Sequence, residues 1–240
     1  MSFKDFTIDS IKYSFQEKTI FLIFGLLLVV LAFLPVAEIM SFEVSFIVKN
    51  IPLVLITAIL LLIQGGYLSK MLEDFVNGSD IIPTPKFSEL TLYLKEGAKD
   101  IVLGVFYMLP IFIVVYIPKS IQSMFGDLYY VVFFLGVILQ YFFLLIIQTA
   151  ILYTVLEDYK TAYNIFYIAK KSIKIGFKRL HLVLILSILI FVVMSSVIVT
   201  HSNPIMTAIV VIIGFFLYPI LAIMDLRYLG LIGREIKNKK

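Results

Sequence analysis

Residues 128–156 read LYYVVFFLGVILQYFFLLIIQTAILYTVL, an apolar run that contains no Asp, Glu, Lys or Arg. A hydrocarbon core about 30 Å thick needs roughly 17 to 25 helical residues, so this run can cross a bilayer as a helix. Its apolar residues do not alternate with polar ones as they do in the strands of a membrane barrel. The sequence therefore predicts an all-α, polytopic membrane helical bundle. Six uncharged apolar runs predict six spans, at about 20–37, 51–68, 101–117, 128–156, 180–200 and 205–224.

The composition agrees with a membrane protein. Hydrophobic residues make up 61% of the 240 residues, and the mean hydropathy is +1.05. This leaves too little polar surface to coat a water-soluble protein of this size. The chain has no cysteine, so neither disulfides nor thiol chemistry are expected.

Positive charge is concentrated in alternate loops. Of the twenty Lys and Arg residues, eighteen precede the first span, join spans two and three or spans four and five, or follow the sixth span. Only Lys49 and Lys119 lie in the other loops. Because Lys-rich and Arg-rich loops stay in the cytoplasm, we predict a multi-pass protein of the cell membrane with both termini cytoplasmic. Its basic face would bind anionic lipid headgroups rather than nucleic acid.

Two local patterns resemble processing signals. Lys4, Lys12 and Lys18 precede the first span as in a signal peptide, but acidic residues lie among them and no small-x-small cleavage site follows Val36-Ala37. We expect this span to be retained. Asn77-Gly78-Ser79 matches the N-glycosylation pattern, but it lies in a predicted cytoplasmic loop and is interpreted as a turn.

A short motif recurs at the cytoplasmic ends of the even-numbered spans. Leu72-Glu73-Asp74-Phe75 follows the second span and Leu156-Glu157-Asp158-Tyr159 follows the fourth, while Met224-Asp225-Leu226-Arg227-Tyr228 is a fainter echo. The chain is interpreted as one integral membrane domain, 1–240, built from three units that each contain an interfacial helix and two spans. Such units would be parallel repeats. Their predicted boundaries are about 1–75, 86–159 and 160–228, followed by a short basic tail at 229–240.

A basic amphipathic helix is predicted before the fifth span. Apolar residues there step by three or four positions, which forms one stripe on a helix, and lysines lie off the stripe. The stripe contains Tyr159, Ala162, Tyr163, Phe166, Ala169, Ile173, Phe177 and Leu180, and the lysines are Lys160, Lys171, Lys174 and Lys178. We expect this helix to lie on the membrane surface and to bind anionic lipid. Weaker patterns of the same kind precede the third span, at 87–101, and the first, at 3–18.

Glycine, tyrosine and proline residues recur in a characteristic order around the second and third spans. They are Gly66-Tyr67-Leu68, Gly78, Pro83, Pro85, Gly97 and Tyr107-Met108-Leu109-Pro110. In order and spacing the chain resembles the domain of unknown function 4013 family, most closely from Gln64 to Ser172. Members of that family often carry an Arg soon after the Gly-Tyr and an acidic, Trp-containing stretch after the prolines. This chain has Ser69-Lys70-Met71 and Lys86-Phe87-Ser88-Glu89-Leu90 there. The resemblance implies a membrane architecture and a cell-membrane location, and no activity.

No catalytic motif or metal-ligand pattern is present in the sequence. His181 and His201 are the only imidazoles, and about 30 Å of predicted helix would separate them, too far to share a metal. The acidic pairs Glu73-Asp74 and Glu157-Asp158 lie at the predicted inner surface. There, helix ending and salt bridges to lysines are favoured over ligand binding. We predict no metal, no cofactor and no enzymatic activity.

Polar groups within the spans are few. Gln64, Gln140 and Gln148 are the bulkiest, and hydrogen bonds between helices are favoured over contact with a ligand. Pro110 and Pro219 interrupt two spans, and simple kinks are favoured over ion sites made by freed carbonyl groups. Glycines in four spans are expected to permit close approach of helices rather than to line a pore; they are Gly25, Gly104, Gly136 and Gly214.

Three functions remain open. The favoured one is a non-enzymatic membrane scaffold or interaction component, with a membrane protein as a possible partner. The alternative is a small-molecule or lipid transporter or channel that works without ion coupling by buried carboxylates, because no acidic residue lies within a predicted span. An intramembrane or interfacial enzyme is the least favoured, since only the acidic pairs and His181 could serve it.

Overall fold

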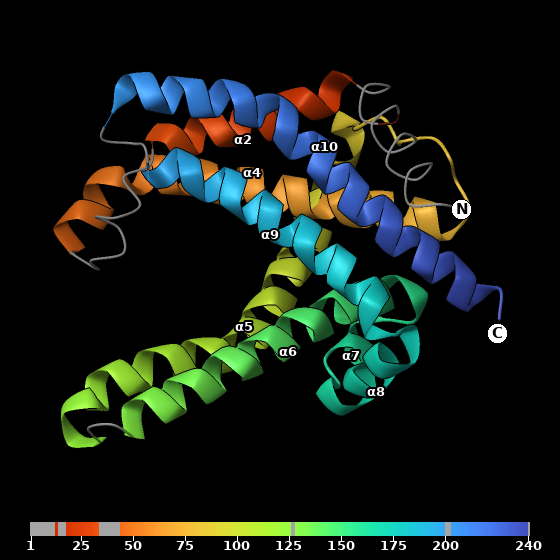
Figure 1. Cartoon of the computed structure of the whole chain (residues 1–240). Helices are drawn as coiled ribbons and strands as arrows, with labels where there is room; N and C mark the ends of the chain where they lie inside the picture. The colour runs from red at the N-terminus through yellow and green to blue at the C-terminus, as the bar shows by residue number, and fades with distance from the viewer. Residues whose placement is uncertain (1–12, 14–17, 34–43, 126–127, 200–202, 240) are drawn as a thin grey trace. The chain divides into compact units, whose positions relative to one another are not determined.

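The described part of the chain is entirely helical in its regular structure, which confirms the predicted all-α fold. The computed structural model describes the backbone of residues 13, 18–33, 44–125, 128–199 and 203–239. Side chains are described within these ranges except at 33, 44–50, 111–125, 128–129, 132–133 and 198–199. The elements are α2 (Lys18–Phe33), α4 (Val44–Val76), the short 3-10 helix η1 (Phe87–Glu89), α5 (Leu90–Phe125), α6 (Leu128–Leu156), α7 (Tyr159–Ala162), α8 (Ile165–Ile175), α9 (Phe177–Val199) and α10 (Pro204–Lys237) (Figure 1).

Four described helices are long and apolar enough to cross a membrane, which makes the chain a membrane protein. Their apolar stretches are Ile51–Val76, Phe134–Leu156, Phe177–Val197 and Pro204–Lys237, and they coincide with the second, fourth, fifth and sixth predicted spans. A shorter apolar helix, Lys18–Ala32, coincides with the beginning of the first predicted span. The end of that span lies outside the described residues, and the third predicted span lies within α5. The count of six spans stays a prediction.

The chain forms two compact units, whose boundaries fall inside α5 and α9. The first unit contains Met1–Ala98 and Ile185–Lys240, and the second contains Lys99–Leu184. In the first unit, α2, α4 and α10 pack against one another (Figure 1). The ring centroids of Phe24 on α2 and Tyr218 on α10 lie 4.9 Å apart. In the second unit, α6 packs against α7 and α8. A core cluster there contains Leu103, Tyr107, Ile147, Ala150, Tyr153, Ala162 and Ile168.

The last helix is longer than the sequence predicted. The sixth span was expected to end at 224 and a short tail to begin at 229, but α10 continues to Lys237. Leu229 and Ile232 are buried, so most of the predicted tail is a packed helix. The physical reason is that the residues after Asp225 keep an apolar face and contain no proline, and this face is buried within the first unit.

The predicted amphipathic helix before the fifth span consists of separate pieces. Asp158 and Asn164 cap the beginnings of α7 and α8, because their side chains accept hydrogen bonds from the backbone N–H groups of Thr161 and Tyr167. Gly176 has φ of 96°, a conformation that glycine adopts at low cost, and it separates α8 from α9. The predicted interfacial helix at 87–101 is η1 together with the beginning of α5, which continues into the third predicted span. The one at 3–18 lies almost wholly outside the described residues.

Two glycines allow α4 and α5 to approach backbone to backbone. A Cβ atom on Gly66 would lie 1.9 Å from the carbonyl oxygen of Tyr93, and one on Gly97 would lie 1.9 Å from that of Leu62. No side chain fits in this space, so the approach requires glycine at both positions. Gly104, farther along α5, has nothing within 4 Å of its Cβ position, so close approach is not its role among the described atoms.

The difference between these glycines gives a test. Gly97→Ala forces α4 and α5 apart, and we expect a loss of about 1 to 3 kcal/mol in the free energy of unfolding. Gly104→Ala adds a methyl group in open space on the same helix, so it should leave stability unchanged or raise it by about 0.5 to 1 kcal/mol. Thermal unfolding of both variants in the same detergent checks this. Equal unfolding temperatures would contradict the role of the glycine contact.

Candidate functional site

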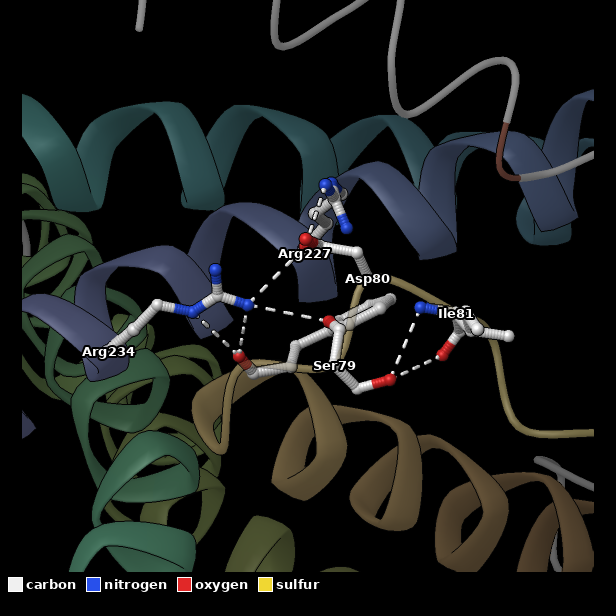
Figure 2. Close-up of polar contacts among 6 residues, drawn as sticks. Ser79, Asp80, Ile81, Arg227 and Arg234 are labelled. Carbon is white, nitrogen blue, oxygen red and sulfur yellow. Dashed lines mark hydrogen bonds and ion pairs between the residues drawn. The ribbon is translucent and has the colours of Figure 1, made fainter.

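Charged side chains meet where the loop after α4 contacts the C-terminal part of α10 (Figure 2). Nη2 of Arg227 and Nη2 of Arg234 each lie 3.5 Å from the same oxygen, Oδ1 of Asp80. We call Ser79, Asp80, Arg227 and Arg234 the Asp80 cluster. Two positive groups share one carboxylate, so the cluster keeps a net positive charge.

Arg234 also completes the C-terminal end of α4. Its guanidinium donates hydrogen bonds to the carbonyl oxygen of Phe75, at 3.4 Å from Nε and 3.2 Å from Nη2, and to that of Ser79 at 3.4 Å. The last carbonyl groups of a helix lack partners within it and lie at the negative end of its dipole, so a cation there is stabilising. Nζ of Lys237 donates to Oδ1 of Asn77 at 2.7 Å. α10 therefore holds both the helix end and the loop that follows it.

The turn in that loop is the one predicted from Asn77-Gly78-Ser79. Gly78 has φ of 99°, and the backbone N–H groups of Asn77 and Ser79 donate to the carbonyl oxygens of Glu73 and Asp74 at 2.9 Å. The hydroxyl of Ser79 donates to the carbonyl oxygen of Ile81 at 3.0 Å (Figure 2). These local bonds fix the direction in which Asp80 points toward α10.

Arg227 is a buried cation. Its side chain is 7% exposed, whereas that of Asp80 is 61% exposed. The guanidinium carbon lies 3.9 Å from the ring centroid of Tyr13 and 5.5 Å from that of Phe75, which are cation–π distances. Nε of Arg227 is buried and has no hydrogen-bond partner among the described residues. Aromatic faces therefore supply much of the compensation for burying this charge.

The Asp80 cluster and the ring of Tyr13, which contacts Arg227, come from three regions that the sequence assigned to one side of the membrane. Tyr13 precedes the first predicted span, Asp80 follows the second, and Arg227 follows the sixth. The second unit contains a similar contact. Nζ of Lys99 lies 4.9 Å from the ring centroid of Tyr159, and the hydroxyl of Tyr159 donates to Oδ1 of Asp100 at 2.7 Å. Phe75 and Tyr159 each follow an acidic pair in sequence, and each ring lies beside a cation, Arg227 or Lys99.

The predicted glutamines have different surroundings. Gln64 on α4 is buried in the first unit, and its side-chain nitrogen donates to the hydroxyl of Tyr218 on α10. Gln140 and Gln148 lie on α6 in the second unit, eight positions or about 12 Å apart along the helix. Gln148 is buried and Gln140 is half-buried. α5 and α10 run on as helices through Pro110 and Pro219.

Asp225 on α10 is an acidic residue that directly follows the sixth predicted span. It is half-buried in the first unit, where the hydroxyl of Ser187 on α9 donates to its Oδ2 at 3.2 Å. Its Oδ1 is buried and has no hydrogen-bond partner among the described residues. The expectation that no acidic residue lies within a predicted span stays a prediction, because Asp225 directly follows the sixth predicted span, 205–224. Asp225 appeared only in the faint third copy of the motif, and its burial follows from the unpredicted extension of α10.

The acidic pairs serve local structure. Glu73 and Asp74 lie 3.8 Å and 4.0 Å from Nζ of Lys70, one turn earlier on α4. Glu157 accepts hydrogen bonds from the hydroxyl of Tyr167, at 3.0 and 3.1 Å. The backbone N–H of Thr161 donates to Oδ1 of Asp158 at 2.6 Å, and this bond holds the pKa of Asp158 below its ordinary value.

Among the residues that the structure describes, histidine and acidic side chains do not gather around a metal site. His181 lies beside Tyr141, whose hydroxyl contacts Nε2, and its Nδ1 lies 2.5 Å from the carbonyl oxygen of Phe177. His201 lies outside the described residues. Across the described ranges, no three His, Asp or Glu side chains are grouped closely enough to hold a metal ion.

The four lysines predicted to bind anionic lipid differ in their surroundings. Nζ of Lys171 lies 4.7 Å and 5.5 Å from the ring centroids of Tyr167 and Tyr153, and the contact with Tyr167 raises the pKa of Lys171. Lys160, Lys174 and Lys178 are exposed. The predicted apolar stripe divides, because Ala162 and Leu180 are buried whereas Phe166, Ile173 and Phe177 are exposed. Exposed apolar and basic side chains thus alternate along α8 and the beginning of α9.

The long apolar helices define the class as an integral membrane protein, whose activity is unassigned. Residues 51–201 match the family described as "Protein of unknown function (DUF4013)". This match covers more than half of the chain, so the chain belongs to that family. The glycine, tyrosine and proline pattern had indicated the same family. No curated protein and no solved structure matches the chain.

Arg234 can be tested through the helix end that it caps. Arg234→Gln removes the cation at Phe75 and Asp80. We expect the free energy of local opening at the end of α4 to fall by about 1 kcal/mol, so that the amides of 75–80 exchange about fivefold faster. Hydrogen–deuterium exchange measures this. Lys239→Gln is the matched control, because Lys239 forms its ion pair with Glu235, one turn earlier on the same segment. Equal exchange in the two variants would contradict the capping role.

Proposed function

We propose that the protein is a non-enzymatic scaffold or interaction component of the cell membrane, with six spans and both termini in the cytoplasm. The observation that carries this proposal is the pairing of Gln64 with Tyr218 between α4 and α10. Both side chains are buried, so the bulkiest polar group of the second span connects helices instead of lining a path. In the second unit, Oγ of Ser172 lies 2.8 Å from Oγ1 of Thr149 and connects α8 with α6 in the same way.

The proposed topology is supported by the Asp80 cluster. Segments that precede the first span and follow the second and sixth spans can meet only on one side of a membrane. Their contacts therefore agree with the distribution of Lys and Arg, which is an independent argument from charge alone. The exposed lysines of α8 would face anionic headgroups on that side.

The alternative is a transporter, and Asp225 is the observation that favours it. An ionisable group within a membrane bundle is by default a candidate for a functional site, and Oδ1 of Asp225 is buried. Ser187 supplies only one described hydrogen bond to it, and the other carboxyl oxygen is left without a described partner. In this alternative, Asp225 and Ser187 would lie on the path of the transported species.

Water access separates the two functions, and the absence of native cysteine makes it easy to measure. We expect Gln64→Cys and Ser187→Cys to stay unmodified by a membrane-impermeant maleimide, because a thiol in dry packing does not ionise. Ser88→Cys, at an exposed position before α5, should react within minutes as the positive control. Rapid modification at both positions, the buried Gln64 and the half-buried Ser187, in folded protein would refute the scaffold and favour transport.

The topology has its own test. With the same reagent, Ser88→Cys should be labelled in inside-out vesicles and protected in intact cells. Ser202→Cys, in the loop predicted between spans five and six, should show the reverse. Labelling of both positions from one side would contradict six spans with cytoplasmic termini.

A further inference from the structure

A cavity of about 220 Å³ opens in the first unit between α2, α4 and the segment that leads into α5. Ile23 and Leu26 of α2 and Leu60 and Ile63 of α4 form its apolar walls. The rings of Tyr67 and Tyr93 close the end nearest α5 and meet edge to face at 5.9 Å. All of these residues belong to one compact unit.

The polar atoms near this cavity are already engaged. The hydroxyl of Tyr67 donates to the carbonyl oxygen of Pro83 at 2.8 Å, and that of Tyr93 donates to Oε2 of Glu89 at 2.9 Å. The walls are almost wholly apolar as a result. A polar solute would lose hydrogen bonds to water and find few hydrogen-bond partners inside, whereas a hydrocarbon chain has no hydrogen bonds to lose on entering.

Charge is confined to one end of the cavity. Lys86 is part of the wall, its side chain is 66% exposed, and Lys18 directly precedes the wall residue Thr19. Glu89 lies 3.7 Å from Lys86 and offsets part of this charge. By the proposed topology Lys86 lies at the cytoplasmic surface, and Leu26 and Leu60 lie deeper in the bilayer. The cavity is thus basic at the cytoplasmic surface and apolar toward the middle of the bilayer. A phospholipid of the inner leaflet has the same order, with its phosphate at the surface and its acyl chains deeper.

We infer that this cavity binds one acyl chain of an anionic phospholipid from the cytoplasmic leaflet, with the lipid phosphate beside Lys86. The volume is below that of a typical site for a whole small ligand, which suits part of one chain with the remainder in the bilayer. The wall residue Phe87 is 96% exposed, and this apolar side chain beside Lys86 suits the membrane interface better than water. The inference goes beyond the proposed function, because a scaffold and a transporter can both hold such a lipid.

The test uses native mass spectrometry of the full chain, delipidated in detergent and supplied with phosphatidylglycerol or phosphatidylcholine of identical acyl chains. We expect one tightly retained phosphatidylglycerol and weaker retention of phosphatidylcholine. Leu60→Trp should fill the cavity and remove retention of both lipids. Lys86→Gln should lower retention of phosphatidylglycerol about fivefold, as expected for one lysine near an anionic headgroup, and lower retention of phosphatidylcholine less, because the choline cation already offsets the charge of its phosphate.

Matched controls keep the site-specific effect apart from general ones. Leu55→Trp adds the same bulk at an exposed position of α4, and Lys174→Gln removes the same charge from α8. Both should retain the lipid as the unaltered protein does. Retention unchanged in Leu60→Trp, or lowered equally by Lys174→Gln and Lys86→Gln, would overturn the inference. If Leu60→Trp unfolds at a lower temperature than Leu55→Trp, Ile63→Phe replaces it with the same expected loss.

Discussion

The hydrocarbon core of a membrane offers no water to backbone N–H and C=O groups, and the rest of this structure depends on that constraint. Each apolar run must satisfy its own backbone, so the described chain is helical wherever it has regular structure. The constraint ends at the membrane surface, where helix ends expose carbonyl groups that need partners. At the end of α4, Arg234 supplies them from a helix about 160 positions away in sequence. Arg234 lies in the part of α10 that continues beyond 224, where the sixth membrane span was expected to end.

Glycine residues set the distance between two of these helices, α4 and α5. Gly66 and Gly97 bring the backbones of α4 and α5 together, and this contact orients the loop that contains Gly78 and Asp80. The glycines, Tyr67 and the prolines that carry the family resemblance therefore belong to one structural element. Tyr67 connects them directly, since its hydroxyl donates to the carbonyl oxygen of Pro83. In this chain, the residues that carry the family resemblance thus join two helices.

Polar groups were easier to find in the sequence than to interpret. Gln64 was recognised as a bulky amide in an apolar run, and hydrogen bonding between helices was favoured for it, but its partner Tyr218 could not be named from spacing alone. Asp225 was missed as a buried group because hydropathy places the end of a span by composition, and α10 continues beyond that point. Arg227 was counted as surface charge, yet the rings of Tyr13 and Phe75 bury it. In each case the missing information was a contact distant in sequence.

The sequence by itself determined that the chain is helical, that it is a membrane protein and to which family it belongs. These properties follow from local composition and from a short ordered set of residues, which need no knowledge of the fold. Only the tertiary structure decided which polar residues are buried, that Arg227 and Arg234 share Asp80, and that α2, α4 and the segment before α5 enclose an apolar cavity. The physical reason is that burial and pairing are properties of two surfaces in contact, and a hydropathy pattern describes only one of them.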